Sequence, residues 1–320
     1  MNYVHSFFLM RVATFPDDPA PRWNNPVLAL GNFDGLHRGH MKIIDRIRQR
    51  AGERAGTPAA MTFDPHPPRV LRPDKAPALL MTKDQKIEAL ARSGMQGVAV
   101  VRFTLELSQW DPEMFVRTVL VDWLHVSEVW VGANFLFGHQ RAGTFSVLRT
   151  LGARYGFRAE KIDPVRYKDF VVSSTRVRRL VGEGRVDEAG ALLGHHYFID
   201  GTVVKGAGRG RELGVPTANL GTLNELVPPA GVYAALLTAD GVVFPSVTNI
   251  GMRPTFADVT EPVIETHVLD FDRDLYGSGV RLSFVQRMRD ERAFANVDAL
   301  RTQIDADRRA ARRLFGRISL

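Results

Sequence analysis

The N-terminal half of the chain alternates short apolar runs with segments of helical spacing. The apolar runs are rich in β-branched residues and predict buried strands at residues 27–30, 58–63, 97–103 and 126–131. Helical spacing between them is found in a segment that ends at Arg50 and in residues 83–93 and 112–121. Strands that alternate with helices indicate parallel βαβ units. We therefore predict a Rossmann-like α/β domain with a doubly wound parallel sheet.

The C-terminal half has a different pattern. Short alternating runs separated by turn residues occur at residues 197–204, 231–237, 242–248, 264–269 and 280–284. This spacing predicts a mostly β domain, most simply a barrel, and an apolar stripe within residues 294–315 predicts a C-terminal helix. Because Gly182-Glu183-Gly184-Arg185 forms a natural break, we predict two domains, 1–184 and 185–320.

Composition narrows the classes of protein that remain. The 320 residues include no Cys, which excludes disulfides, thiolate metal sites and Cys nucleophiles. Neither a cleavable leader nor a run of roughly 20 apolar residues is visible, so we expect a cytoplasmic protein without a membrane partner. A net charge of +7 indicates anionic ligands. We expect no nucleic-acid partner, because no groove-reading helix or aromatic RNA platform is evident.

The segment Gly31-Asn32-Phe33-Asp34-Gly35-Leu36-His37-Arg38-Gly39-His40 follows the first apolar run and opens the first helix. A strand that ends in such a turn directs backbone N–H groups and the positive end of a helix dipole at a phosphate. His37 and His40 are three residues apart and should project from one side, where imidazolium can stabilise a phosphate being displaced. Glycine and histidine also occur beside such turns for purely structural reasons.

Three further segments of this half carry polar or aromatic groups at strand ends. His66 lies on a loop stiffened by prolines. It either contacts a ligand or is a loop residue without a functional role. Asn134 and Phe135 lie between two glycines that permit approach of a flat ring, although the aromatics also suit the core. Arg176 falls in the first turn of a helix, where an anion would offset its charge, whereas Ser173 and Ser174 are equally plausible as helix caps.

In the second half, a glycine-rich basic loop precedes Pro216-Thr217-Ala218-Asn219. Such a loop can close on a polyphosphate or serve as a linker. Thr217 and Asn219 are two residues apart, so in an extended segment their oxygens could ligate Mg²⁺ together. Glu265 is set in an alternating run and is either a solvent-facing residue or a general base for a hydroxyl.

These motifs carry a family resemblance. The segment from Gly31 to His40 resembles the nucleotidyltransferase motif of bacterial FAD synthetases, which is related to the HIGH element of class I aminoacyl-tRNA synthetases. Ser173-Ser174-Thr175-Arg176 resembles that family's second nucleotide-contacting motif. Pro216 to Asn219 is similar to the PTAN motif of riboflavin kinase, residues 249–256 to its NIGxRPTF loop, and residues 264–271 to the strand with its catalytic glutamate.

Joined in one chain, these motifs imply a bifunctional riboflavin kinase and FMN adenylyltransferase that uses MgATP twice. The resemblance implies catalytic roles for Glu265, His37, His40 and Arg176, and Mg²⁺ ligation by Thr217 and Asn219. It implies ATP or phosphate contacts from Gly31, Phe33, Asp34, Gly35, Ser173, Ser174, Thr175, Gly206, Gly208, Arg209, Gly210 and Gly214. It implies flavin contacts from His66, Asn134, Phe135, Asn249, Gly251, Arg253 and Thr255.

The expected partners are therefore ATP, riboflavin and FMN, with the chain a monomer or a weak homo-oligomer. One alternative keeps both folds without turnover: a flavin-sensing regulator in which one or both sites are inactive. No chemically indispensable residue is visibly missing from either motif set.

Overall fold

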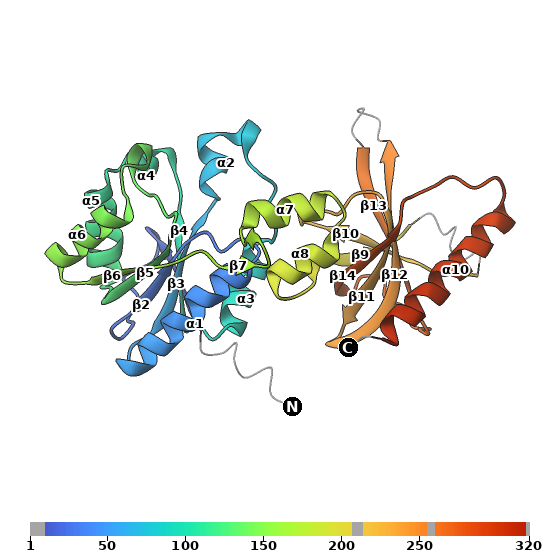
Figure 1. Cartoon of the computed structure of the whole chain (residues 1–320), viewed down its shortest axis with the longest axis horizontal. Coiled ribbons are helices and arrows are strands. Elements are labelled where there is room, and N and C mark those ends of the chain that lie inside the picture. Colours follow the sequence, from blue (N-terminus) through green and yellow to red (C-terminus); the bar gives the residue numbers. More distant parts are fainter. Residues whose placement is uncertain (1–9, 207–213, 255–259, 318–320) are drawn as a thin grey trace. The chain divides into compact units, whose positions relative to one another are not determined.

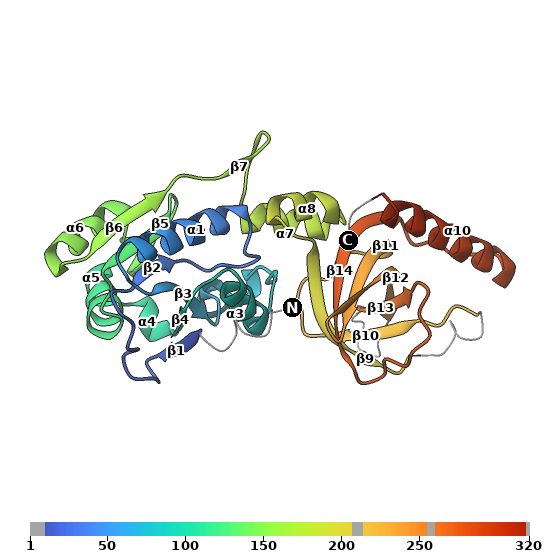
Figure 2. The same cartoon turned by 90° about the horizontal axis from the view of Figure 1, so that it is seen from below.

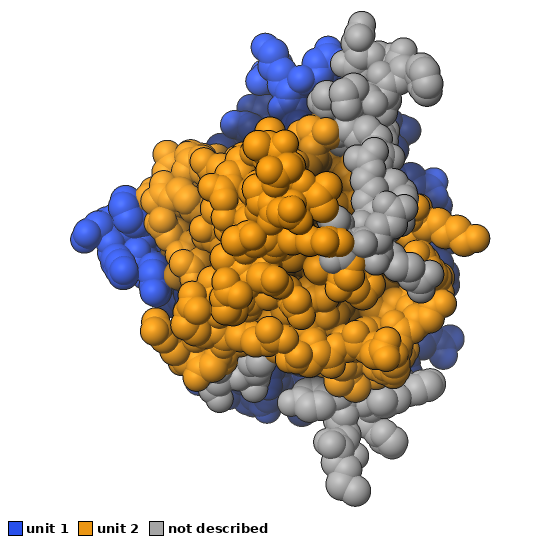
Figure 3. Space-filling model, turned by 90° about the vertical axis from the view of Figure 1, so that its right-hand side faces the viewer, with its two compact units in different colours: residues 1–174 blue, residues 175–320 orange. Residues whose placement is uncertain are grey.

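The computed structural model describes residues 10–206, 214–254 and 260–317. The chain divides into two compact units, Met1–Ser174 and Thr175–Leu320, which are coloured separately in Figure 3. Each unit is described by itself below. The domain boundary expected after residue 184 stays a prediction.

The first unit is built on a six-stranded sheet in the order β1-β4-β3-β2-β5-β6. All of its strand pairs are parallel, which confirms the predicted class of sheet. The strands are β1 (Arg11–Phe15), β2 (Val27–Leu30), β3 (Pro58–Asp64), β4 (Gly97–Arg102), β5 (Glu128–Gly132) and β6 (Arg158–Ile162). From β2 the chain adds β3 and then β4 on one side of the sheet, and it then adds β5 and β6 on the other side of β2. The loops after β2 and β5 therefore flank a topological switch point, where open α/β sheets bind ligands.

Alternate residues of each strand point to opposite faces of this sheet, and each face buries its own apolar cluster. Val27 and Ala29 of β2 pack with α1, whereas Leu28 and Leu30 belong to the cluster that includes the π-helix η3 and α6. Helices thus cover both faces (Figures 1 and 2). The helices are α1 (Arg38–Glu53), α2 (Pro67–Leu71), α3 (Lys83–Arg92), α4 (Leu105–Ser108), α5 (Pro112–Phe115), η3 (Val116–Trp123) and α6 (Phe145–Tyr155).

A fully buried carboxylate, Glu128, joins β5 to α1. Arg50 donates to both of its oxygens at 3.0 Å, Arg54 donates at 2.9 Å, and the indole of Trp130 donates at 2.6 Å. Burial alone raises the pKa of Glu128, but the hydrogen bonds from Arg50 and Trp130 outweigh it and hold the pKa below its usual range. Glu128 is therefore an ionised, structural residue.

Glu128→Ala is expected to destabilise the first unit by about 3–5 kcal/mol, because it leaves two guanidinium groups without their buried partner. All four tryptophans of the chain, at positions 23, 110, 123 and 130, lie in this unit. Their fluorescence during urea unfolding therefore reports on this unit selectively. Glu53→Ala removes an exposed partner of the same Arg50 and should cost less than about 1 kcal/mol. Equal losses from the two variants would contradict this account.

The second unit contains a closed antiparallel barrel in the order β10-β13-β12-β11-β14-β9, which confirms the expected β-barrel. A C-terminal helix, α10 (Val297–Phe315), packs on it through Ala311 and Phe315. Figure 1 shows this helix beside the barrel strands. The strands are β9 (Tyr197–Val204), β10 (Ala218–Thr222), β11 (Gly231–Ala239), β12 (Val242–Pro254), β13 (Thr260–Val268) and β14 (Gly279–Arg289). The helices are α7 (Ser174–Gly182), α8 (Val186–Leu193) and α10 (Val297–Phe315). Among the described residues, no helix is both long and apolar enough to cross a membrane.

Candidate active sites

The loop after β2 is held in a tight, partly left-handed conformation. Phe33, Gly35 and Leu36 have φ values of 50°, 84° and 38°, so two side-chain-bearing residues adopt a region that favours glycine. Phe33 is fully buried in the apolar cluster beneath α1, which leaves its backbone rather than its ring for contact with a nucleotide. The N–H of Gly31 donates to the carbonyl of Met61 at 3.1 Å. Gly31 therefore anchors the loop to β3.

The buried carboxylate of Asp34 serves the protein's own backbone. Its Oδ1 accepts from the N–H of Leu80 at 3.0 Å and from that of Met81 at 3.3 Å. These bonds fasten the loop to the segment before α3. The contact of Asp34 with phosphate stays a prediction.

The two motif histidines lie together, as their spacing predicts. His37 is the N-cap of α1, and its Nδ1 accepts from the backbone N–H of His40 at 3.3 Å. The rings are stacked, with centroids 3.7 Å apart and planes 9° from parallel. No acidic residue lies in the first turn of α1, so its positive end stays open to an anion.

The protonation of the pair differs from the expected imidazolium. A nitrogen that accepts a hydrogen bond carries no proton, so Nδ1 of His37 is bare. Burial lowers the pKa of His40 well below its usual value, and a positive charge on His37 or Lys86 lowers it further. Nδ1 of His40 is buried and has no hydrogen-bond partner in the part of the chain that the structure describes. In the free protein His40 is therefore a neutral imidazole, and a bound polyanion would raise its pKa.

A buried lysine completes this region, and sequence reasoning missed it. Lys86 of α3 lies 3.3 Å from the hydroxyl of Thr62, which in turn donates to the carbonyl of Asn32 at 3.0 Å. Burial lowers the pKa of Lys86, while the charges of Asp34 and Asp64 act in the opposite direction. Its position four residues before the buried Leu90, on the apolar face of α3, was the available signal.

His66 is buried at the carboxyl end of β3 and lines a small cavity with Lys86 and Thr62. The predicted loop position is thus confirmed, and the side chain lies beside the same lysine that reaches the loop after β2. Its contact with flavin stays a prediction.

The loop after β5 begins beside the loop after β2, because Val131 pairs with Leu30. Asn134 is exposed there. Phe135 is half-buried and stacks on Phe137 with centroids 5.7 Å apart and planes 19° from parallel, and Phe137 is core. The loop can therefore offer an amide and one face of an aromatic ring to a ligand.

Ser174 ties the second motif to the first. Its hydroxyl donates to the carbonyl of Asp34 at 2.8 Å, and α7 begins at Ser174 itself, so this hydroxyl is a tether between motifs rather than a helix cap. Ser173 immediately precedes it. Thr175 and Arg176 belong to the second unit, and their approach to the histidines stays a prediction.

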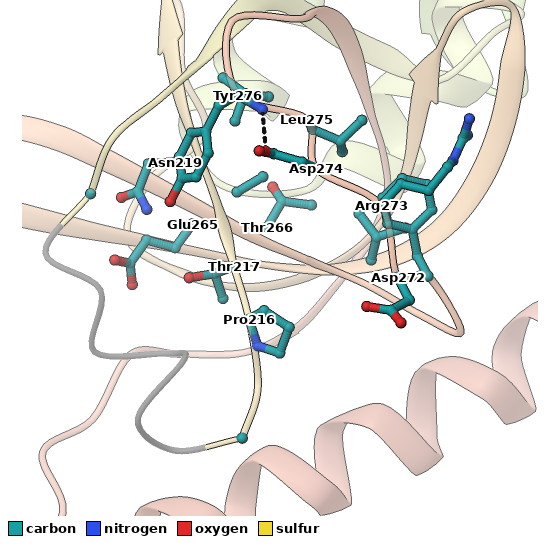
Figure 4. Close-up of a pocket in the computed structure, with 16 residues that line it drawn as sticks. Pro216, Thr217, Asn219, Glu265, Thr266, Asp272, Arg273, Asp274, Leu275 and Tyr276 are labelled. Atoms are coloured by element: carbon teal, nitrogen blue, oxygen red, sulfur yellow. Dashed lines mark hydrogen bonds between the residues drawn. The ribbon is translucent and has the colours of Figure 1, made fainter.

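In the second unit, a cavity of about 420 Å³ is bordered by most of the described residues that sequence reasoning assigned to the kinase. Figure 4 shows the side chains of Thr217, Asn219 and Glu265 directed toward one space. Gly206 and Gly214 line the same cavity. The structure thus brings together residues that are up to 59 positions apart, since the set extends from 206 to 265.

Sheet register explains this convergence. On β13, Glu265 pairs with Asn219 of β10 on one side and with Asn249 of β12 on the other. Directly opposed residues of antiparallel strands place their side chains on the same face. The carboxylate therefore lies in a row between two amides, which can orient it and a nearby ligand.

Gly206 permits close packing at this row. A Cβ built on Gly206 would lie 2.1 Å from Nδ2 of Asn219, which is an impossible contact. The amide of Asn219 is therefore seated directly against the backbone at the end of β9.

Gly206→Ala is expected to displace the Asn219 amide and to lower riboflavin phosphorylation at least about tenfold, because small misplacements of binding groups carry large rate penalties. FMN adenylylation should stay unchanged. Gly279→Ala in the same unit is the matched control, since a Cβ there meets nothing within 4 Å. A fall in both activities for Gly206→Ala, or in neither, would contradict the packing argument.

The segment from Phe271 to Tyr276 also lines the cavity, and none of its six residues was predicted as a site residue. The guanidinium of Arg273 lies 5.0 Å from the centroid of Phe271, and the N–H of Tyr276 donates to Asp274 at 2.9 Å, as drawn in Figure 4. The available signal was a run of three charged residues, 272–274, between the aromatic residues Phe271 and Tyr276.

Several predicted residues lie outside what is described. Gly208, Arg209, Gly210 and Thr255 are not among the described residues, nor is the side chain of Arg253. Gly251 is described, and a Cβ there would meet the carboxylate of Glu291 at 2.8 Å. The roles of this group stay predictions.

No cluster of three or more His, Asp or Glu ligands is present within residues 10–206, 214–254 and 260–317. A cation held here by the described residues would therefore have fewer than three such ligands. Mg²⁺ in proteins is usually bound by one or two protein ligands together with substrate phosphates.

Comparison with known proteins covers both units. The family model of FAD synthetase matches residues 20–176, and that of riboflavin kinase matches residues 193–315. The bifunctional riboflavin kinase/FMN adenylyltransferase of Pseudomonas fluorescens is 39% identical over 294 residues, covering 92% of this chain and 94% of the relative. The Bacillus subtilis (strain 168) and Escherichia coli (strain K12) relatives are each 36% identical and cover 91% of this chain and 93% of their own.

A crystal structure described as a macrolide-efflux protein from Streptococcus pneumoniae has a TM-score of 0.87 and 27% identity, over 94% of this chain and 98% of that one. The match extends over nearly all of both chains. The two sets of motifs, the two folds and the relatives that match over most of their length all indicate the same family. The chain belongs to the bifunctional riboflavin kinase/FMN adenylyltransferase family, which uses ATP to make FMN and FAD.

Proposed function

We propose that the barrel unit phosphorylates riboflavin with Glu265 as general base and that the sheet unit adenylylates FMN with His37, His40 and Arg176. The observation that supports this most is the row of Asn219, Glu265 and Asn249, in which Asn219 and Glu265 line the cavity. The domain boundary at 184 belongs to the same proposal.

In the kinase, Glu265 takes the proton of the ribityl hydroxyl as that oxygen attacks the γ-phosphate of ATP. The two flanking amides orient the carboxylate and the hydroxyl. The loop from Gly206 to Gly214 covers the phosphates, and Asn249, Gly251, Arg253 and Thr255 contact the flavin. ADP leaves, and FMN carries the transferred phosphate.

Thr217 and Asn219 are proposed to hold Mg²⁺. The site fits this ion: a hydroxyl and an amide oxygen border the cavity, and the amide is seated against Gly206, where a Cβ would not fit. When bound, Mg²⁺ neutralises charge on the transferring phosphate.

In the adenylyltransferase, the phosphate of FMN attacks the α-phosphate of ATP and pyrophosphate departs. The FMN phosphate is already ionised at neutral pH, so this site needs stabilisation of the leaving group more than a base. His37 and His40 lie at the open end of α1 for that task, and Arg176 adds charge. Gly35, Ser173 and Thr175 contact the phosphates, while His66, Asn134 and Phe135 orient the flavin.

The enzyme acts in the cytoplasm, where ATP is available, as a monomer or weak homo-oligomer. Its small-molecule partners are ATP, riboflavin and FMN.

The test supplies the full chain with ATP and either riboflavin or FMN, at increasing Mg²⁺ concentrations, and separates the flavins by chromatography. Riboflavin should yield FMN and then FAD, and FMN should yield FAD. Product formation that is independent of Mg²⁺ would contradict the metal assignment. Absence of FMN and FAD throughout would support an inactive flavin sensor instead.

A further inference from the structure

His267 lies on β13 two residues beyond Glu265 and therefore on the same face of the strand. Its Nδ1 lies 2.9 Å from the carbonyl oxygen of Pro216. A carbonyl oxygen can only accept, so Nδ1 of His267 donates this hydrogen bond. Pro216 is the residue directly before Thr217, and the imidazole thus reaches the start of the segment that carries both proposed metal ligands.

This bond extends a very short strand pairing. β10 pairs with β13 only at Ala218, opposite Thr266, and at Asn219, opposite Glu265. The next position of that register would place His267 opposite Thr217. Pro216 has no N–H to donate to a ladder, and the side chain of His267 binds its carbonyl instead. Beyond Ala218, the segment that contains Thr217 is therefore held to β13 by the side chain of His267 and not by a backbone ladder.

The surroundings of the ring suit this role. His267 is half-buried, and its Nε2 is buried without a hydrogen-bond partner among the described residues. Burial lowers the pKa of His267 from its usual value, the Pro216 bond raises it, and the charges of Arg308 and Arg312 lower it. The charge of Asp270, which is paired with Arg312 at 2.6 Å, raises the pKa of His267. A neutral imidazole has one N–H, and here the carbonyl bond assigns it to Nδ1.

We propose that His267 is a positioning residue of the kinase: through its bond to the Pro216 carbonyl it holds Thr217 in line with Asn219 and Glu265. This inference rests on the proposed roles of Thr217 and Asn219. Loss of the bond would free residues 216–217 while leaving Glu265 in its strand. The expected defect is therefore in the use of MgATP more than in proton removal.

Three substitutions separate this role from general packing. His267→Asn keeps a donor close to the position of Nδ1, His267→Gln moves the donor toward that of Nε2, and His267→Leu removes it. We expect His267→Leu to lower riboflavin kinase kcat/KM by about 10–100-fold, mainly through a higher KM for MgATP. His267→Asn should recover activity to within about threefold of the original chain, and His267→Gln should not. FMN adenylylation by the same preparations should stay unchanged.

The outcomes decide the proposal in each case. Equal kinase activity in the Asn and Gln variants, or an unaffected Leu variant, would overturn it. Should the Leu variant not fold, the comparison of Asn with Gln still decides, since both carry an amide and differ in its reach. Kinase activity that survives Thr217→Ala and Glu265→Gln would instead refute the proposed site, which distinguishes that failure from a failure of the His267 inference.

Discussion

Glu265→Gln is expected to abolish riboflavin phosphorylation while FMN is still converted to FAD at a near-normal rate. An amide cannot accept the proton of the ribityl hydroxyl, and loss of a positioned general base lowers rates by about 10²–10⁴-fold. Glu265 lies opposite Asn219 and Asn249 in the strand register. Glutamine has nearly the same size as glutamate, so the substitution should leave the packing of this row unchanged. Chromatography of the flavins formed from riboflavin and, separately, from FMN measures both activities.

A matched control for this variant is Asp240→Asn, which makes the same carboxylate-to-amide change at an exposed turn between β11 and β12. Asparagine tolerates the positive φ of that turn, so the control should phosphorylate riboflavin normally. Loss of both activities in a folded Glu265→Gln enzyme would refute the assignment of the two reactions to separate sites. Full kinase activity would remove Glu265 from the reaction.

His40→Ala is expected to stop the pathway at FMN. The ring lies against His37 at the beginning of α1 and edge-on to Phe33 of the loop after β2, where it can donate to charge that develops on the departing pyrophosphate. Removal of one such preorganised donor lowers rates by about 10²–10³-fold. Riboflavin should therefore accumulate as FMN, with kinase rates unchanged.

His125→Asn is the control for His40→Ala, because His125 is exposed and lies away from the sheet's carboxyl ends, after η3. Tryptophan fluorescence of both variants during urea unfolding separates loss of catalysis from loss of the fold. Undiminished FAD output from His40→Ala would exclude this residue from adenylyl transfer.

Local features of the two sites were predictable because they are encoded by nearest neighbours. A three-residue interval at a helix start places His37 beside His40, as the stacked rings confirm. Continuous apolar runs separated by helical segments predicted the parallel sheet. Alternation of apolar and polar residues predicted the barrel, since the period of two is a property of any half-buried strand. The role of Glu265 rested on family resemblance, because a glutamate in an alternating run is equally typical of a solvent-facing position.

Long-range contacts decided what the local pattern could not. The carboxylate of Asp34 accepts hydrogen bonds from backbone N–H groups 46 and 47 residues away. The carboxylate of Glu128 accepts one from Arg50, 78 residues away. In the sequence, Lys86 cannot be distinguished from an exposed, charged helix residue. In the structure it is buried and lies beside Thr62. Burial, in turn, lowers the pKa of His40 well below its usual value, which the spacing of the two histidines does not indicate.

The sequence by itself determined the fold classes of the two domains and the order of their motifs. These follow from periodicity, turn residues and short spacings, all of which act within a few residues. Only the tertiary structure decided which strands are neighbours, and so which amides flank Glu265 and which carbonyl His267 holds. Strand register depends on the packing of whole faces against a core, and that energy belongs to no single segment of the chain.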